Sequence, residues 1–275
     1  MTSPTPAHAA RHSVDLIHNI GERFAAPALH NGENATRLPG RNGMSAATVV
    51  LVHAPTGTPA EWSRLVPLLE DAGVPNVAVH LPSSLPASEL DDGAYLRSVL
   101  DGLEGATVLV GHSSGGFPIT QAGDHPGVRH LVYLDAALPD VGETLLDLYE
   151  PGDMDESFAA CFTYGPETVV LEAGPLVTHL QERGWPAQEA RELASGLVPS
   201  RYAALVLAVT VASWRTVPST FIGCADSPTR SEARARFASR AMHAIEIPGD
   251  HFALWQRPGE LAEIITRIAQ DATAP

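Results

Sequence analysis

The sequence contains no lysine. All 17 of its basic residues are arginine, and with 32 aspartates and glutamates the formal net charge is −15. A chain this acidic has no basic field to attract nucleic acids, phosphorylated polyanions or anionic membranes, so we do not expect these as partners. The charge does not select among small molecules.

Cysteines and long apolar runs are also scarce. Cys161 and Cys224 are the only cysteines, and they form no framework of spacings, which favours a reducing compartment. No run approaches the roughly 18 apolar residues that span a bilayer, and no basic segment followed by an apolar one opens the chain. We therefore expect a cytoplasmic protein. The histidines lack metal-site spacing, so neither a metal nor another cofactor is expected.

Strand and helix patterns alternate from residue 47 onward, which indicates an α/β fold with a mostly parallel sheet and helices on both faces. We expect strands near 47–52, 77–81, 107–110, 131–134, 220–225 and 244–247, and helices near 62–72, 89–103, 116–122 and 261–268. The preceding residues 1–45 lack a sustained period. They are interpreted as an N-terminal extension, partly disordered or forming a short helix.

The segment Gly111-His112-Ser113-Ser114-Gly115 follows an apolar run and precedes a predicted helix. In this strand-turn-helix context, the pattern is typical of a nucleophile elbow, in which flanking glycines allow a turn too tight for side chains. The serine hydroxyl then lies beside helix N-terminal N–H groups that stabilise an oxyanion. The alternative is an ordinary glycine-rich loop.

Two further strands end in side chains that suit a serine nucleophile. Asp226 follows the strand at 220–225, and His251 follows the strand at 244–247. A second candidate acid, Asp135, follows the strand at 131–134. Either acid gives the chain order Ser, Asp, His, and we favour Asp226.

With these residues, the sequence over about 47–270 resembles the α/β-hydrolase superfamily. Within it, the chain is similar to the branch of small bacterial esterases, plant methylesterases and hydroxynitrile lyases, through the segments 111–116, 132–140, 214–218 and 224–226. The resemblance implies that Ser113 is the nucleophile, His251 the general base and acid, and Asp226 the orienting carboxylate. It also implies a helical cap, residues 138–216, inserted into a domain of residues 46–275.

The loop after the first strand departs from the family pattern. The family has His-Gly followed by a residue whose N–H completes the oxyanion hole, whereas this chain has His53-Ala54-Pro55, and proline has no N–H. The candidate donors are therefore the Ser114 amide, Thr56 through its amide or hydroxyl, and Ala54. Losing one donor typically costs about 3 kcal/mol of transition-state stabilisation.

Two other types of reaction found in the resembled superfamily can be set aside. The plant lyases place a lysine beside the catalytic histidine, where this chain has Phe252, so hydrolysis is favoured over cyanide release. Dehalogenases and epoxide hydrolases use an aspartate at the elbow, which Ser113 excludes.

The substrate is expected to be a small, apolar carboxylic ester or lactone, because the cap is rich in aromatic residues. The candidate pocket residues are Phe117, Phe158, Phe162, Trp185, Trp214 and Phe252, each of which is also a candidate for plain core packing. The alternative function is a non-catalytic module that binds a small ligand on the same scaffold. A monomer and a homodimer both remain open.

Overall fold

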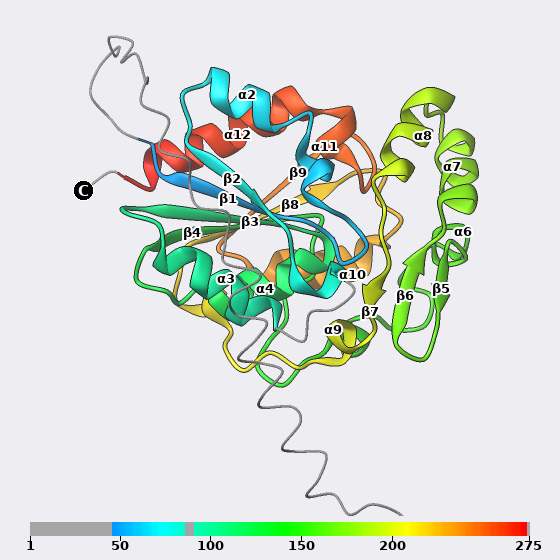
Figure 1. The fold of residues 1–275 in the computed structure, drawn as a ribbon, viewed down its shortest axis with the longest axis horizontal. Helices are drawn as coiled ribbons and strands as arrows, with labels where there is room; N and C mark the ends of the chain where they lie inside the picture. The colour runs from blue at the N-terminus through cyan, green and yellow to red at the C-terminus, as the bar shows by residue number, and fades with distance from the viewer. Residues whose placement is uncertain (1–45, 86–90, 274–275) are drawn as a thin grey trace, which may run out of the picture. The chain divides into compact units, whose positions relative to one another are not determined.

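A six-stranded sheet forms the centre of the computed structural model, which describes residues 46–85 and 91–273 (Figure 1). The predicted extension, residues 1–45, lies outside the described residues. In spatial order the strands are β2 (Asn76–Val79), β1 (Thr48–Val52), β3 (Thr107–His112), β4 (Val128–Leu134), β8 (Ser219–Cys224) and β9 (His243–Ile247). Each pair of neighbours is parallel, so the carboxyl ends of these strands meet at one edge.

Helices cover both faces of this sheet. One face carries α2 (Val66–Asp71), α11 (Ala253–Gln256) and α12 (Pro258–Asp271), and the other carries α3 (Asp92–Asp101), α4 (Gly116–Ala122) and α10 (Ser231–Arg240) (Figure 1). Along β1, Val49 and Leu51 pack into one hydrophobic cluster, whereas Val50 and Val52 pack into the other. A strand buried on both faces reads as a continuous apolar run, as the sequence does here.

The predicted fold class is confirmed, and the differences are local. Helix α10 was not predicted, because only Ala233 and Phe237 of its ten residues are buried and its apolar periodicity is therefore weak. Among the described residues, no helix combines the length and the hydrophobicity needed to cross a bilayer.

The predicted cap, residues 138–216, falls in the segment between β4 and β8. Its helices are α5 (Leu145–Leu148), α6 (Glu156–Ala159), α7 (Ala173–Glu182), α8 (Ala187–Ser195) and α9 (Ala203–Val206). It also contains an antiparallel sheet that we did not predict, formed by β5 (Phe162–Tyr164), β6 (Thr168–Leu171) and β7 (Ser200–Arg201). Strands β5 and β6 consist largely of aromatic and β-branched residues, which suit a strand better than a helix.

Short 3-10 turns follow three of the strands at the site-bearing edge: η1 (Pro59–Trp62) after β1, η2 (Pro82–Ser84) after β2 and η3 (Ser113–Gly115) after β3. A fourth, η4 (Ser213–Arg215), precedes β8. Turn η3 joins β3 directly to α4, with no intervening loop residue, and so carries the predicted elbow.

Candidate active site

The elbow at Ser113 is as tight as its glycines predict. A Cβ on Gly111 would lie 2.5 Å from the Gly115 carbonyl oxygen, and one on Gly115 would lie 2.6 Å from the carbonyl oxygen of Val52. Real Cβ atoms do not approach backbone this closely, so both positions require glycine. Strand β3 therefore reverses into α4 immediately beneath Ser113.

Backbone strain occurs at two positions that bear on this site. Among the described residues, the non-glycine residues with positive φ are Ser113, at 56°, and Asp135, at 41°. The left-handed region costs a non-glycine residue about 1–2 kcal/mol. Such strain persists only where the surrounding structure enforces it, and it concentrates at functional sites.

Asp135 is the carboxylate that contacts His251. The Nδ1–H of His251 donates to Oδ2 of Asp135 at 2.7 Å, and both side chains are buried. The same oxygen accepts from the Ser227 hydroxyl at 2.6 Å, while Oδ1 accepts from the Cys224 amide at 3.3 Å. Burial by itself raises the pKa of Asp135, but the hydrogen bond and charge of His251, with the other two donors, outweigh it and hold the pKa below its usual value.

The preference for Asp226 as the acid therefore disagrees with the structure. Asp226 is exposed. Its amide donates to the Gly249 carbonyl at 2.9 Å, and its carbonyl accepts from Arg183 at 3.2 Å. Strand β4 pairs with β3, so Asp135 emerges beside the elbow, whereas Asp226 lies two residues beyond the end of β8. The alternative acid is the one placed against the histidine.

Ser113 and His251 line a common cavity of about 190 Å³, which we call the nucleophile chamber. Its polar lining is completed by Thr56, Glu61, Ser114 and Thr229. Its apolar lining includes three of the predicted pocket residues, Phe158, Phe162 and Phe252, together with Leu145, Leu146, Tyr149, Met154, Val169, Leu171, Leu197 and Leu205. The lining of the chamber is thus mainly apolar.

The other three predicted pocket residues lie elsewhere. Phe117 lines a neighbouring cavity, and neither Trp185 nor Trp214 lines either one. The indole N–H of Trp185 donates to Asp250 at 2.6 Å, and that of Trp214 donates to the Pro139 carbonyl at 2.7 Å. Both tryptophans hold segments of the chain together, because a buried indole N–H needs an acceptor and each finds one in the fold.

The loop at 53–58 is an ordered turn. His53 donates from Nδ1 to the Ala54 carbonyl at 2.6 Å and accepts from the Leu81 amide at its other ring nitrogen, at 3.1 Å. The carbonyl of Pro55 accepts from the Ser84 hydroxyl at 2.6 Å, and that of Thr56 accepts from the Val198 amide at 2.9 Å. These bonds fix the loop beside the chamber without filling it.

The three candidate oxyanion donors differ in their surroundings. The Ser114 amide lies in the first turn after β3, where no preceding helical carbonyl can accept from it. Thr56 lines the nucleophile chamber with Ser113 and Ser114. The Ala54 amide, by contrast, donates to the Glu61 carboxylate at 3.4 Å. Thr56 is therefore the better candidate for the second donor.

A second buried acid and histidine lie beneath the first pair, and we did not predict them. Oε1 of Glu61 lies 2.7 Å from Nδ1 of His112, whose Nε2–H donates to the His251 carbonyl at 2.8 Å. Because Nε2 carries a proton, a second proton must lie between His112 and Glu61. Burial lowers the pKa of His112, but the charge and hydrogen bond of Glu61 outweigh it, and the pKa is raised.

Sequence reasoning missed Glu61 because, in Pro-Ala-Glu-Trp, it resembles an exposed acid in the first turn of a helix. Its place depends on Gly57, where a Cβ would lie 2.4 Å from Oε2. The indole N–H of Trp255 donates to the Glu61 carbonyl at 3.0 Å and fixes its backbone. Glu61 thus positions His112, which in turn binds the backbone of His251.

We expect Glu61→Leu to lower the free energy of unfolding by about 1–3 kcal/mol, because it leaves Nδ1 of buried His112 without a partner. Glu61→Gln, which keeps a hydrogen-bonding group there, is the matched control and should lose less. A histidine whose pKa is raised on folding stabilises fully below about pH 6.5 and loses this contribution as the pH rises through the raised pKa.

Urea unfolding at several pH values checks this expectation. The difference between the wild type and Glu61→Leu should be largest below pH 6.5 and should shrink as the pH rises above it. A difference that grows with pH would show that Glu61 does not stabilise the charged form of His112.

Comparison with known proteins identifies the family of this chain. The model of the α/β-hydrolase family matches residues 49–264. The chain is 26% identical over 249 residues to the probable hydrolase R7 of Phoma sp., covering 82% of this chain and 99% of that one. It is 35% identical over 120 residues to a pyrethroid hydrolase of Sphingobium wenxiniae, covering 40% of this chain and 43% of that one.

Among solved structures, polyneuridine aldehyde esterase is similar with a TM-score of 0.69 and 23% sequence identity, covering 81% of this chain and 99% of that chain. The resemblance derived from the sequence motifs is confirmed. The family match spans β1 to α12, and with them every strand of the central sheet. The chain therefore belongs to the α/β-hydrolase family.

Proposed function

We propose that this protein is a serine hydrolase that cleaves apolar carboxylic esters or lactones through an acyl-enzyme. The observation that carries the proposal is the 2.7 Å hydrogen bond from His251 to buried Asp135, with Ser113 of the elbow lining the same chamber as His251. Asp135 replaces Asp226 in this assignment. The hydrolase relatives support the reaction class.

The bond from Nδ1 to Asp135 leaves Nε2 of His251 as the base. It takes the Ser113 hydroxyl proton as Oγ attacks the ester carbonyl carbon. The carbonyl oxygen becomes an oxyanion, stabilised by the Ser114 amide and Thr56. Collapse breaks the bond to the alkoxy group, which takes the proton from His251. Water then repeats the cycle on the acyl-enzyme, releasing the acid and free Ser113.

The alternative of a ligand-binding module has less support. A 53–58 loop that filled the pocket would have favoured it, whereas a cavity of about 190 Å³ adjoins Ser113 and Thr56 lies at its wall. The apolar lining of that cavity supports an apolar substrate, because hydrocarbon groups lose less hydration there than polar groups do.

Labelling with a fluorophosphonate tests the proposal without knowledge of the substrate. The probe reacts with a serine only if both the nucleophile and the oxyanion hole work. We expect the intact mass of the wild type to rise by one adduct and that of Ser113→Ala to stay unchanged. An unlabelled wild type that is folded by circular dichroism would contradict the proposal.

The second oxyanion donor has its own test. We expect Thr56→Val, which removes the hydroxyl but keeps the shape, to lower kcat by about 100-fold, the cost of one donor. Thr56→Ser keeps the hydroxyl and should retain most of the activity on p-nitrophenyl esters. Equal activity in the wild type and Thr56→Val would assign the role to the backbone amide instead.

A further inference from the structure

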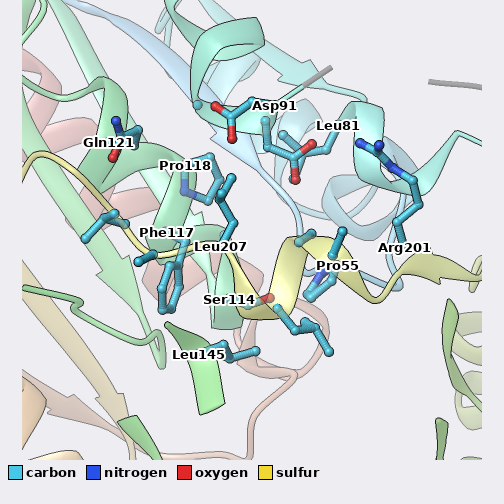
Figure 2. A pocket seen from close by; sticks show the side chains of 18 of the residues that line it. Pro55, Leu81, Asp91, Ser114, Phe117, Pro118, Gln121, Leu145, Arg201 and Leu207 are labelled. Atoms are coloured by element: carbon cyan, nitrogen blue, oxygen red, sulfur yellow. The ribbon is translucent and has the colours of Figure 1, made fainter. Parts of the chain in front are cut away.

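A second, larger cavity adjoins the elbow, and His251 is not among the residues that line it. Its volume is about 500 Å³, and we call it the rear chamber (Figure 2). It shares four lining residues with the nucleophile chamber: Pro55, Ser114, Leu145 and Leu205. Figure 2 shows Ser114 and Pro55 among the side chains of this cavity. The two chambers therefore meet at the residue that follows the nucleophile.

The reaction chemistry sets a direction across this junction. His251 lines the nucleophile chamber and not the rear chamber. Its Nε2 must give a proton to the departing alkoxide oxygen, so the alcohol has to leave on the His251 side. The carbonyl oxygen points to the Ser114 amide. The remaining substituent of the carbonyl carbon is the acyl chain, which is directed away from His251.

From this arrangement we infer that the rear chamber is the acyl subsite and that the substrate carries an extended or ring-bearing acyl group. The inference rests on the proposed function, because it uses His251 as the proton donor. A volume of about 500 Å³ lies within the range of about 300–1,000 Å³ that holds drug-sized ligands. The nucleophile chamber, at about 190 Å³, then takes the smaller alcohol. The expectation of a small substrate thus changes to one with a small alcohol and a larger acid.

The lining of the rear chamber defines the chemistry of that acyl group. Its apolar part is formed by Leu81, Phe117, Pro118, Leu207 and Val209, of which Phe117 and Pro118 belong to α4, the helix that begins directly after the elbow. Other parts of the lining carry polar groups, namely Asp91, Asp92, Gln121, Arg201 and Thr210. An acyl group that is hydrocarbon near the carbonyl therefore fits best, with any polar group borne farther along the chain.

Substitution of a residue that lines only one chamber can fill that chamber and leave the other unchanged. Ala208 lines only the rear chamber and is half-buried, whereas Leu146 lines only the nucleophile chamber and is half-exposed. Neither belongs to the proposed catalytic machinery. Ala208→Trp and Leu146→Trp are thus a matched pair, and exposed Leu207 offers a second rear-chamber variant, Leu207→Trp.

The experiment measures kcat/KM for two series of esters. p-Nitrophenyl acetate, butyrate and octanoate vary the acyl group, whereas phenyl and 1-naphthyl acetate vary the alcohol. We expect Ala208→Trp to lower the octanoate-to-acetate ratio about tenfold or more, the scale for a few blocked methylenes, and to leave the naphthyl-to-phenyl ratio within twofold. Leu146→Trp should instead lower the naphthyl-to-phenyl ratio about tenfold or more and leave the octanoate-to-acetate ratio within twofold.

Two results would overturn the inference. One is an unchanged octanoate-to-acetate ratio in both rear-chamber variants, and the other is a fall in the naphthyl-to-phenyl ratio caused by Ala208→Trp. Failure of the proposed function is distinguishable, because the wild type would then form no fluorophosphonate adduct and cleave none of the esters. If the wild type is labelled but the rear-chamber variants leave the octanoate-to-acetate ratio unchanged, only the assignment of the acyl subsite is overturned.

Discussion

Asp135→Asn is expected to lower kcat/KM for p-nitrophenyl esters by about 10⁴-fold. An asparagine can offer its amide N–H to Nδ1, which favours the tautomer of His251 that cannot accept the Ser113 proton at Nε2. The substitution is nearly isosteric, and asparagine tolerates the positive φ of 41° at this position better than most residues do. The loss should therefore appear as altered chemistry in a folded protein.

Asp226→Asn is the matched control, because it makes the same chemical change at the acid that we favoured from the sequence. Asp226 is exposed, and its hydrogen bonds to Gly249 and Arg183 are made through its backbone, so activity should stay within about twofold of the wild type. If Asp226→Asn lost the activity and Asp135→Asn kept it, the assignment of Asp135 would be wrong.

Ser113→Gly and Ser113→Ala are both expected to lower kcat by about 10⁶-fold, the scale of losing a serine nucleophile. Their stabilities should differ. Ala keeps a Cβ at φ 56°, whereas Gly relieves that strain. After allowance for the greater flexibility of unfolded glycine, we expect Ser113→Gly to be more stable than Ser113→Ala by about 1 kcal/mol.

Urea denaturation of the two variants, with ester kinetics alongside, measures both effects. Equal unfolding free energies would show that the strain at Ser113 is no larger than the extra conformational entropy of an unfolded glycine. Residual activity in both variants near the wild-type rate would place the nucleophile at another residue. An inactive Ser113→Gly variant that is more stable than Ser113→Ala would show that the backbone conformation at the site lowers the stability of the fold.

The sequence by itself determined the elements that depend on local pattern. Apolar runs such as 47–52 predict a buried strand, because a parallel strand covered on both faces excludes polar residues. The glycines at 111 and 115 predict the elbow, because the turn leaves no room for a Cβ. Pro55 predicts a missing oxyanion donor, since proline lacks an N–H in any fold.

Only the tertiary structure decided which carboxylate meets His251. Asp135 and Asp226 both follow a strand of the same sheet, and the order of strands, with the burial of one loop and exposure of the other, separates them. The partnership of Glu61 with His112 and the two chambers on either side of Ser114 also required the fold. Local patterns report how one segment meets water and its own backbone, whereas these contacts join residues from segments far apart in the chain.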